Sequence, residues 1–228
     1  MSQTTYLSNK ARLLKDFDKS LARLRKGLVA RCGEAEAASL IGEARHWYEE
    51  IIPQIPYIGK GNPFLIFLLP ATRYLAVYRA FQEHGWSLEE IGRLVYALGE
   101  SEFKELPGWM RHLIGILWFS PWLTVRIRKR ALSSHDRIYP GDYVLDYVTA
   151  GPGFDWGVDY VECASCKFLD DQDAPELKPF VCAVDKIASE MLGWGLKRTK
   201  TLAEGGDRCD FRFKKGGQTN VSIPQSLL

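Results

Sequence analysis

The stretch YPGDYVLDYV, residues 139–148, marks the point at which the chain changes from helical to strand-like sequence. Within it Tyr143, Leu145 and Tyr147 occupy alternate positions, and this period of two is typical of a strand. Before it, apolar residues recur every three or four positions, as they do in amphipathic helices. Helices followed by strands indicate the α+β class.

Further strands are predicted after this point, at residues 157–163, 196–202 and 208–214. A helix is predicted over residues 179–192, because Pro179 suits its first turn and Gly193 its end. The order β-β-α-β-β predicts a small antiparallel sheet with a packed helix.

The chain before residue 139 carries helical periodicity in separate segments. The predicted helices are one through Leu14–Leu28 closed by Gly33, one ending before Pro53, one opened by Asn62 and Pro63 and ended by Gly85, one from Ser87 to Gly99, and one over residues 108–132. We therefore divide the chain into a helical region (1–138), a Cys-bearing α+β region (139–215) and a loose tail (216–228). The first two regions can form one domain.

Composition favours a soluble globular protein: the 228 residues are 46% hydrophobic and 25% charged, with a net charge of +2. This small charge argues against a polyanion partner, and we expect no nucleic acid. No apolar signal sequence follows the polar stretch Met1–Asn9. We expect a cytoplasmic protein, and the sequence leaves its oligomeric state open.

The longest apolar stretch without a charge, Leu113–Val125, is too short to span a bilayer of roughly 30 Å. Basic residues at positions 126 and 128–130 follow it. An interfacial membrane helix is one interpretation, and a buried helix with a basic end is the preferred one. We therefore expect no membrane partner.

Four of the five cysteines fall between Cys163 and Cys209. Cys163 and Cys166 form a CxxC pair, but a redox pair needs a helix that begins inside the motif, and the following residues 167–171 predict a poor helix start. Zinc bound by Cys163, Cys166, Cys182 and Cys209 is an alternative, although the spacing fits neither a finger nor a ribbon. We expect no cofactor.

Cys182 and Asp185 share one side of the predicted helix 179–192, opposite its apolar stripe. Cys182 lies near the N-terminus of this helix, where the helix dipole favours a thiolate. Asp185, one turn later, is placed to orient water or a partner. The alternative is a cysteine that only packs against a neighbouring element.

The final hairpin brings polar residues together around Cys209. A symmetric turn would place Thr201 opposite Cys209, Thr199 opposite Phe211 and Lys200 opposite Asp210. This register puts Cys209 on the inner face. It predicts that the outer face carries the charged side chains of Arg198, Lys200, Asp210 and Arg212. These side chains form a cross-strand charge ladder, which is the preferred interpretation, or an anion-binding patch.

Several of these segments resemble the L-2-amino-thiazoline-4-carboxylate hydrolase family, over about residues 160–214. The matching segments are Glu162-Cys163, Pro175–Leu177, Cys182–Asp185 and Arg198–Gly206 closing on Cys209–Phe211. The resemblance implies hydrolytic opening of a cyclic amidine-like ring at C2, which gives an N-carbamoyl-cysteine.

From this chemistry we infer roles for the candidate residues. Cys182 attacks C2 or Asp185 activates water, with Cys209 and Asp210 positioning these groups. The substrate-binding candidates are Arg198 or Lys200 for the carboxylate, Thr199 or Thr201 for the amidine nitrogens, and Cys163. The alternative is a non-catalytic ligand-binding module with core or metal-binding cysteines, because the Gly-Asp-x-Cys-x-Phe ending faintly resembles the 4-vinyl-reductase-type module.

Overall fold

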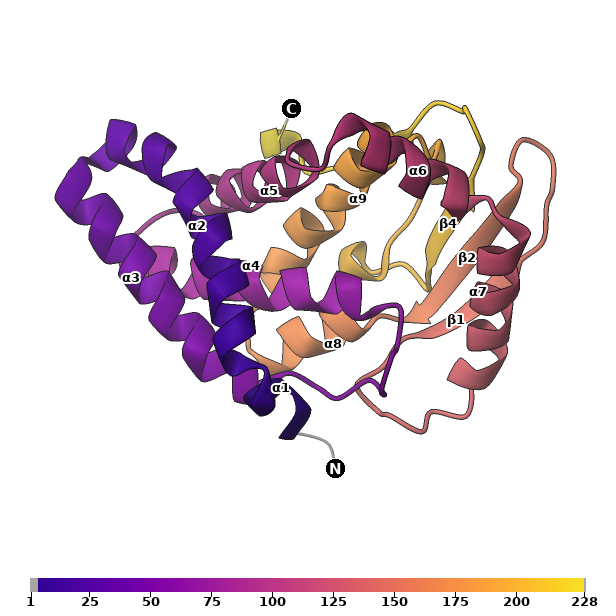
Figure 1. Cartoon of the computed structure of the whole chain (residues 1–228), viewed down its shortest axis with the longest axis horizontal. Coiled ribbons are helices and arrows are strands. Elements are labelled where there is room, and N and C mark those ends of the chain that lie inside the picture. Colours follow the sequence, from indigo (N-terminus) through magenta and orange to yellow (C-terminus); the bar gives the residue numbers. More distant parts are fainter. Residues whose placement is uncertain (1–3, 228) are drawn as a thin grey trace.

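The structure, a computed structural model, describes residues 4–227 (Figure 1). Helices form the first part: α1 (Thr4–Ser8), α2 (Lys10–Cys32), α3 (Glu34–Ile51), α4 (Leu65–Glu83), α5 (Leu88–Lys104), α6 (Gly108–Trp118) and α7 (Pro121–Ser134). Strands and helices then mix: β1 (Val144–Val148), β2 (Trp156–Glu162), α8 (Ala164–Asp171), α9 (Lys178–Leu192), β3 (Leu196–Arg198), β4 (Cys209–Phe213) and β5 (Asn220–Val221). This confirms the α+β class.

The strands form one sheet in the order β1-β2-β4-β3-β5. The pairs β1–β2, β2–β4 and β4–β3 are antiparallel, whereas β3 and β5 run parallel. The sheet is therefore mixed, and the expected purely antiparallel sheet was wrong. The difference comes from the segment after Gly216, predicted as a loose tail, which instead adds β5 to the sheet edge.

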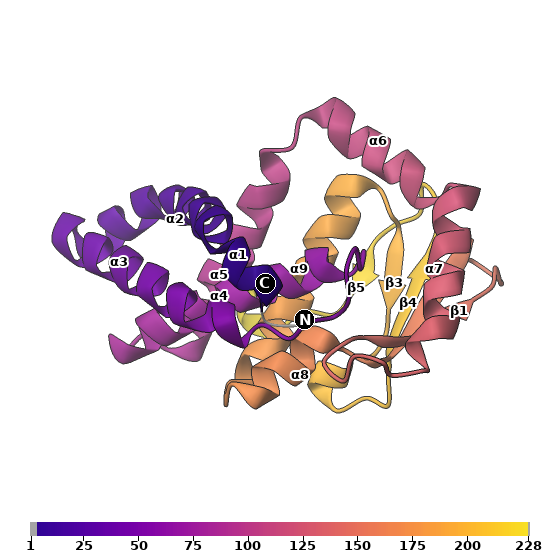
Figure 2. The same ribbon diagram turned by 60° about the horizontal axis from the view of Figure 1, so that its bottom comes forward.

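Helix α9 lies between α5 and the sheet and joins the two parts of the chain (Figures 1 and 2). Its Phe180 and Val184 pack against Gly92 and Gly99 of α5. On its other side Ser189 Oγ accepts a hydrogen bond of 2.9 Å from the backbone N–H of Leu196. One cluster of buried apolar residues runs from Tyr6 to Val221, so the helices and the sheet share a core.

Local end signals set most helix boundaries. Gly33 ends α2, Ser87 and Glu90 form a capping box for α5, and Gly193 closes α9 in the left-handed conformation. These ends confirm the predictions except that α5 continues past Gly99 to Lys104. Gly99 does not end α5. It allows the helix to pack closely against Val184 of α9.

The long helix predicted over residues 108–132 is two helices, α6 and α7. Ser120 is the N-cap of α7 and accepts a hydrogen bond of 3.3 Å from the N–H of Leu123, and Pro121 fills the first helical position. The chain therefore breaks and restarts between Trp118 and Pro121. Between residues 4 and 227 no helix has the length and apolar character needed to cross a bilayer.

Helix α8 begins inside the CxxC motif, contrary to the predicted poor helix start. Cys163 is its N-cap, with extended backbone angles of φ −116° and ψ 120°. The buried side chains of α8 include Cys166, Phe168 and Leu169. Burial of this face stabilises a helix that the local sequence favours only weakly.

The register of the last hairpin also differs from the prediction, by one residue. Leu196 pairs with Phe213 and Lys197 with Arg212, so Arg198 lies on the inner face of the sheet with Cys209. The predicted outer charge ladder is therefore wrong for Arg198. In the connection that follows β3, Asp210 Oδ1 accepts the backbone N–H groups of both Thr199 and Lys200, so these residues do not continue the regular pairing of a symmetric hairpin.

The contact between Gly92 and Phe180 predicts a test of the α5–α9 packing. A Cβ at position 92 would overlap the ring of Phe180, so Gly92→Ala should lower the free energy of unfolding in urea by about 1–3 kcal/mol. Gly27→Ala is the control, because its new Cβ meets nothing within 4 Å in α2 and should stabilise the protein by up to about 1 kcal/mol. Equal effects of the two substitutions would contradict the packing described.

Candidate functional site

Three thiols from three places in the fold lie close together. Cys163 follows β2, Cys166 lies in the first turn of α8, and Cys182 lies in the first half of α9. The Cys166 thiol interacts with the thiols of both Cys163 and Cys182. Cys163 and Cys182 are partly exposed, whereas Cys166 is buried, and all are free. We call Cys163, Cys166 and Cys182 the thiol cluster.

Cys163 is the member of the cluster whose surroundings favour a thiolate. The Cys166 thiol lowers the pKa of Cys163, and the backbone N–H groups of Cys166 and Ser165 lower it further against the opposing effect of burial. These N–H groups belong to the first turn of α8, although neither completes a cap hydrogen bond to the sulfur. A helix N-terminus and a neighbouring donor are the usual means of activating a cysteine.

The surroundings of Cys166 favour the protonated thiol instead. Its interactions with Cys163 and Cys182, together with burial, raise the pKa of Cys166 well above that of an ordinary thiol. It therefore stays protonated and keeps its single S–H as a donor. The sequence alone does not reveal the interaction of Cys166 with Cys163, because that interaction depends on α8.

Asp185 lies one helical turn after Cys182 and is held by Arg198. The Arg198 Nη1 donates to Asp185 Oδ2 at 2.5 Å and to the carbonyl of Cys182 at 2.9 Å, and its Nη2 donates to the carbonyl of Ser222 at 3.1 Å. Only 2% of the Arg198 side chain is exposed, against 29% for Asp185. The guanidinium is thus enclosed, while the carboxylate retains contact with solvent.

Desolvation raises the pKa of Asp185 above the usual aspartate value, although the Arg198 cation opposes this shift. A carboxylate with a raised pKa is a stronger base than an exposed one. The pair therefore suits proton transfer better than simple charge neutralisation.

Two tyrosines border the cluster. Tyr160 pairs with Cys209 across β2 and β4, and burial together with the charges of Asp185 and Cys163 raises its pKa well above the usual tyrosine value. Tyr143 is fixed by a 3.0 Å hydrogen bond with Ser165 Oγ, and the Ser165 hydroxyl donates to the carbonyl of Phe67 in α4. Both phenols therefore stay neutral. The inner position of Tyr160 follows from the period of two in β2.

Cys209 lies near the cluster but serves structure. It is buried, its sulfur accepts the N–H of Leu202 at 3.2 Å, and burial raises the pKa of this thiol well above its usual value. It stands directly opposite Tyr160 in the sheet. This environment holds Cys209 as a neutral thiol that supports the start of β4.

The remaining candidates shape the β3–β4 connection. Asp210 accepts hydrogen bonds from the N–H groups of Thr199 and Lys200 and from the Thr199 hydroxyl, which hold its pKa below the usual range although desolvation opposes this. Thr201 caps a short 3₁₀ turn at Glu204, and Lys200 Nζ pairs with Asp207 at 2.5 Å. Because β4 alternates, Asp210 points away from the face that carries Cys209. These residues are not brought to the thiol cluster.

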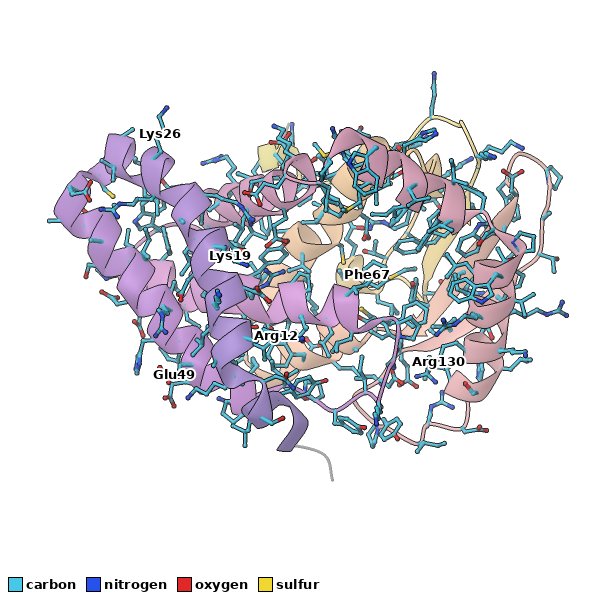
Figure 3. All side chains as sticks on the ribbon, viewed as in Figure 1. Arg12, Lys19, Lys26, Glu49, Phe67 and Arg130 are labelled. Carbon is cyan, nitrogen blue, oxygen red and sulfur yellow. The ribbon has the colours of Figure 1, made fainter. Side chains whose placement is uncertain are left out.

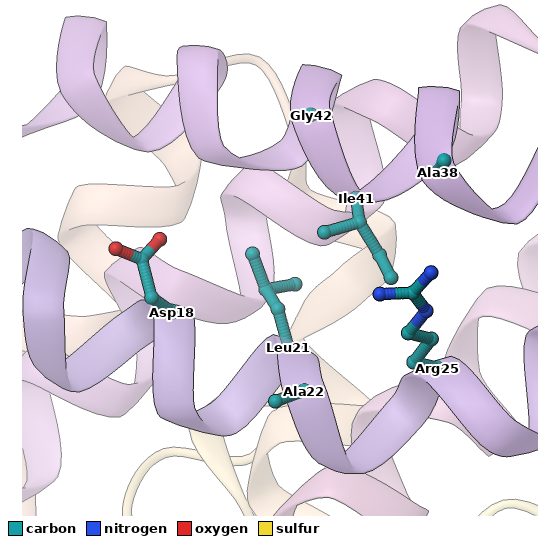
Figure 4. A pocket seen from close by; sticks show the side chains of 7 residues that line it. All are labelled: Asp18, Leu21, Ala22, Arg25, Ala38, Ile41 and Gly42. Atoms are coloured by element: carbon teal, nitrogen blue, oxygen red, sulfur yellow. The ribbon is translucent and has the colours of Figure 1, made fainter.

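Within residues 4–227, no group of three or more His, Cys, Asp or Glu side chains has an arrangement that suits a metal ion. The hollows described on the surface lie elsewhere. One lies between α2 and α3, where Leu21, Arg25 and Ile41 are among its lining residues (Figure 4). Another lies beside Tyr147 and Trp156. Neither contains a cysteine or a member of the Asp185–Arg198 pair.

Comparison with known proteins extends the resemblance far beyond its expected limits. The L-2-amino-thiazoline-4-carboxylic acid hydrolase family matches residues 69–213, from α4 to the end of β4, and so includes the thiol cluster and the Asp185–Arg198 pair. Searches among curated proteins and among solved structures give no match. The family match spans well over half of the sequence, and the chain therefore belongs to the L-2-amino-thiazoline-4-carboxylic acid hydrolase family.

Proposed function

We propose that this protein hydrolyses a small cyclic amidine of the 2-aminothiazoline-4-carboxylate type, with Cys163 as nucleophile. The observation that carries the proposal is the position of Cys163 at the N-terminus of α8 beside the Cys166 donor, which lowers the pKa of the Cys163 thiol. Family membership supplies the reaction class. Of the thiols in the sheet region, Cys163 combines a depressed pKa with partial exposure.

In the first step the Cys163 thiolate attacks C2 of the ring, which lies between nitrogen and sulfur. A bond forms between Sγ and C2, the ring C2–S bond breaks, and the departing substrate thiolate takes up a proton. The product of this step is an isothiourea on Cys163. The Cys166 thiol stabilises the Cys163 thiolate before attack.

In the second step Asp185 takes a proton from water and passes it to the imine nitrogen, while the water oxygen bonds to C2. The C2–Sγ bond then breaks, Cys163 leaves as a thiolate, and the remaining hydroxyl proton goes to solvent. The released product is the N-carbamoyl-cysteine. Arg198 positions Asp185 and does not contact the substrate, because its guanidinium is enclosed.

Thiol release from aminothiazoline carboxylate in large excess tests the function. The wild-type protein should release many thiols per chain, and Cys163→Ala should reduce the rate by at least about a hundredfold because the nucleophile is absent. Cys32→Ala, at the distant end of α2, is the matched control and should retain full turnover. Turnover by Cys163→Ala with a native unfolding curve would exclude the covalent route.

Asp185→Asn separates the two steps. The first step needs no base, so this variant should release one thiol per chain and then stop, with the substrate retained on Cys163 in the intact mass spectrum. The variant also leaves Arg198 buried without its anion, which should lower the free energy of unfolding by about 3 kcal/mol. Steady multiple turnover, or a stalled variant without an adduct, would show that Asp185 is not the base.

Cys166→Ala tests the origin of the Cys163 thiolate through pH. Loss of the Cys166 donor should raise the pKa of Cys163 towards the ordinary thiol value of about 8.5, so the rise of turnover and of iodoacetamide alkylation with pH should move to more alkaline pH. Cys166→Ser, which can still donate, should lie between the two. An unchanged pH profile would assign Cys166 to packing alone.

A further inference from the structure

Large apolar side chains are exposed along α6 and α7. No residue of α6 is buried, and 67% of Trp109 and 62% of Trp122 are accessible. We use the term α6–α7 face for the exposed set Trp109, Leu113, Ile116, Leu117, Trp122 and Val125. Figure 2 shows the two helices following one another along the outer edge of the molecule, away from α2 and α3.

The exposure is not the result of poor packing, because the inner sides of both helices are used. Trp118 stacks on Trp194 with ring centroids 4.0 Å apart, and Ile127 and Ala131 of α7 are buried. The residues of the α6–α7 face recur mostly at three- and four-residue spacing, so each helix has a second apolar side. No part of the described chain covers that second side.

Positive charge accompanies this face without acidic residues. From Leu106 to His135 the sequence contains no Asp or Glu. The side chains of Arg126, Arg128 and Lys129 are exposed, and among residues 4–227 none has a carboxylate partner. The Arg126 guanidinium lies 4.7 Å from the centroid of the Trp122 ring. Arg130, labelled in Figure 3, is different, because it is paired with the buried Asp142.

We propose that the α6–α7 face binds the surface of a membrane that contains anionic phospholipid. Exposed tryptophans and aliphatic residues bordered by unpaired cations are the composition of helices that lie in the interface. α6 has 11 residues and α7 has 14, so each is too short to span and fits an in-plane position. A second copy is the poorer occupant, since a two-fold contact would bring the cations of both chains together. The proposal replaces the expectation of no membrane partner.

Flotation with vesicles tests this surface independently of the proposed hydrolysis. The full chain should float with phosphatidylcholine vesicles that contain about a third phosphatidylserine, less with phosphatidylcholine alone, and less as salt rises. Arg128→Glu and Lys129→Glu should each lower the partition coefficient about fivefold or more, the factor that corresponds to roughly 1 kcal/mol per cation. Absence of flotation with the anionic vesicles would overturn the proposal.

Ile116→Ser and Ile66→Ser form a matched pair for the apolar contribution. Both residues are exposed isoleucines on helices, 46% and 65% respectively, but only Ile116 lies on the α6–α7 face. Ile116→Ser should reduce flotation about tenfold and Ile66→Ser should not, with unfolding curves unchanged. Equal losses would overturn the proposal. So would a dimer in sedimentation that Ile116→Ser dissociates, because the face would then belong to a second copy.

Discussion

The ion pair between the buried Arg198 and the partly exposed Asp185 connects the parts of this fold that carry the candidate site. Arg198 is the last residue of β3. Its guanidinium donates to the Asp185 carboxylate and the Cys182 carbonyl of α9, and to the carbonyl of Ser222, which follows β5. Since the guanidinium is enclosed, its charge must be neutralised there. The pair therefore fixes α9 against the sheet and thereby sets where Cys182 stands relative to Cys166.

The thiol cluster and its neighbour Cys209 show how tertiary structure divides similar side chains into different roles. Cys163 gains a helix N-terminus and a donor, Cys166 gains burial and two sulfur neighbours, and Cys209 gains a backbone N–H in an apolar site. In the proposed reaction the same residue type thus becomes a nucleophile, a donor and a structural residue. The distinction depends on where α8 begins and cannot be read from the spacing of the cysteines.

Local signals predicted much of the fold, and family resemblance predicted part of the site. The capping box at Ser87 acts within one helical turn, so sequence alone places that helix end. Helix α8 could not be found in this way, because burial of Phe168 and Leu169 stabilises it. The resemblance includes the segments that contain Cys163, Cys182, Asp185 and Arg198 but not Cys166, whose place beside Cys163 depends on α8. The hairpin register, and with it the face of Arg198, was not predicted, because hydrogen bonds from the Thr199 and Lys200 N–H groups to Asp210 replace regular pairing there.

That register also determines where the chain tolerates changes in length. The connection between β3 and β4 is exposed around Gly205, which adopts a left-handed conformation and has open space beside its Cα. A residue inserted there lengthens a surface turn at little entropic cost. A residue inserted within β4 would instead exchange the two faces of the strand beyond it, and would direct the charged Arg212 inward in place of the buried Phe213. Among related chains, length variation should therefore collect in the turn and be absent from the strand.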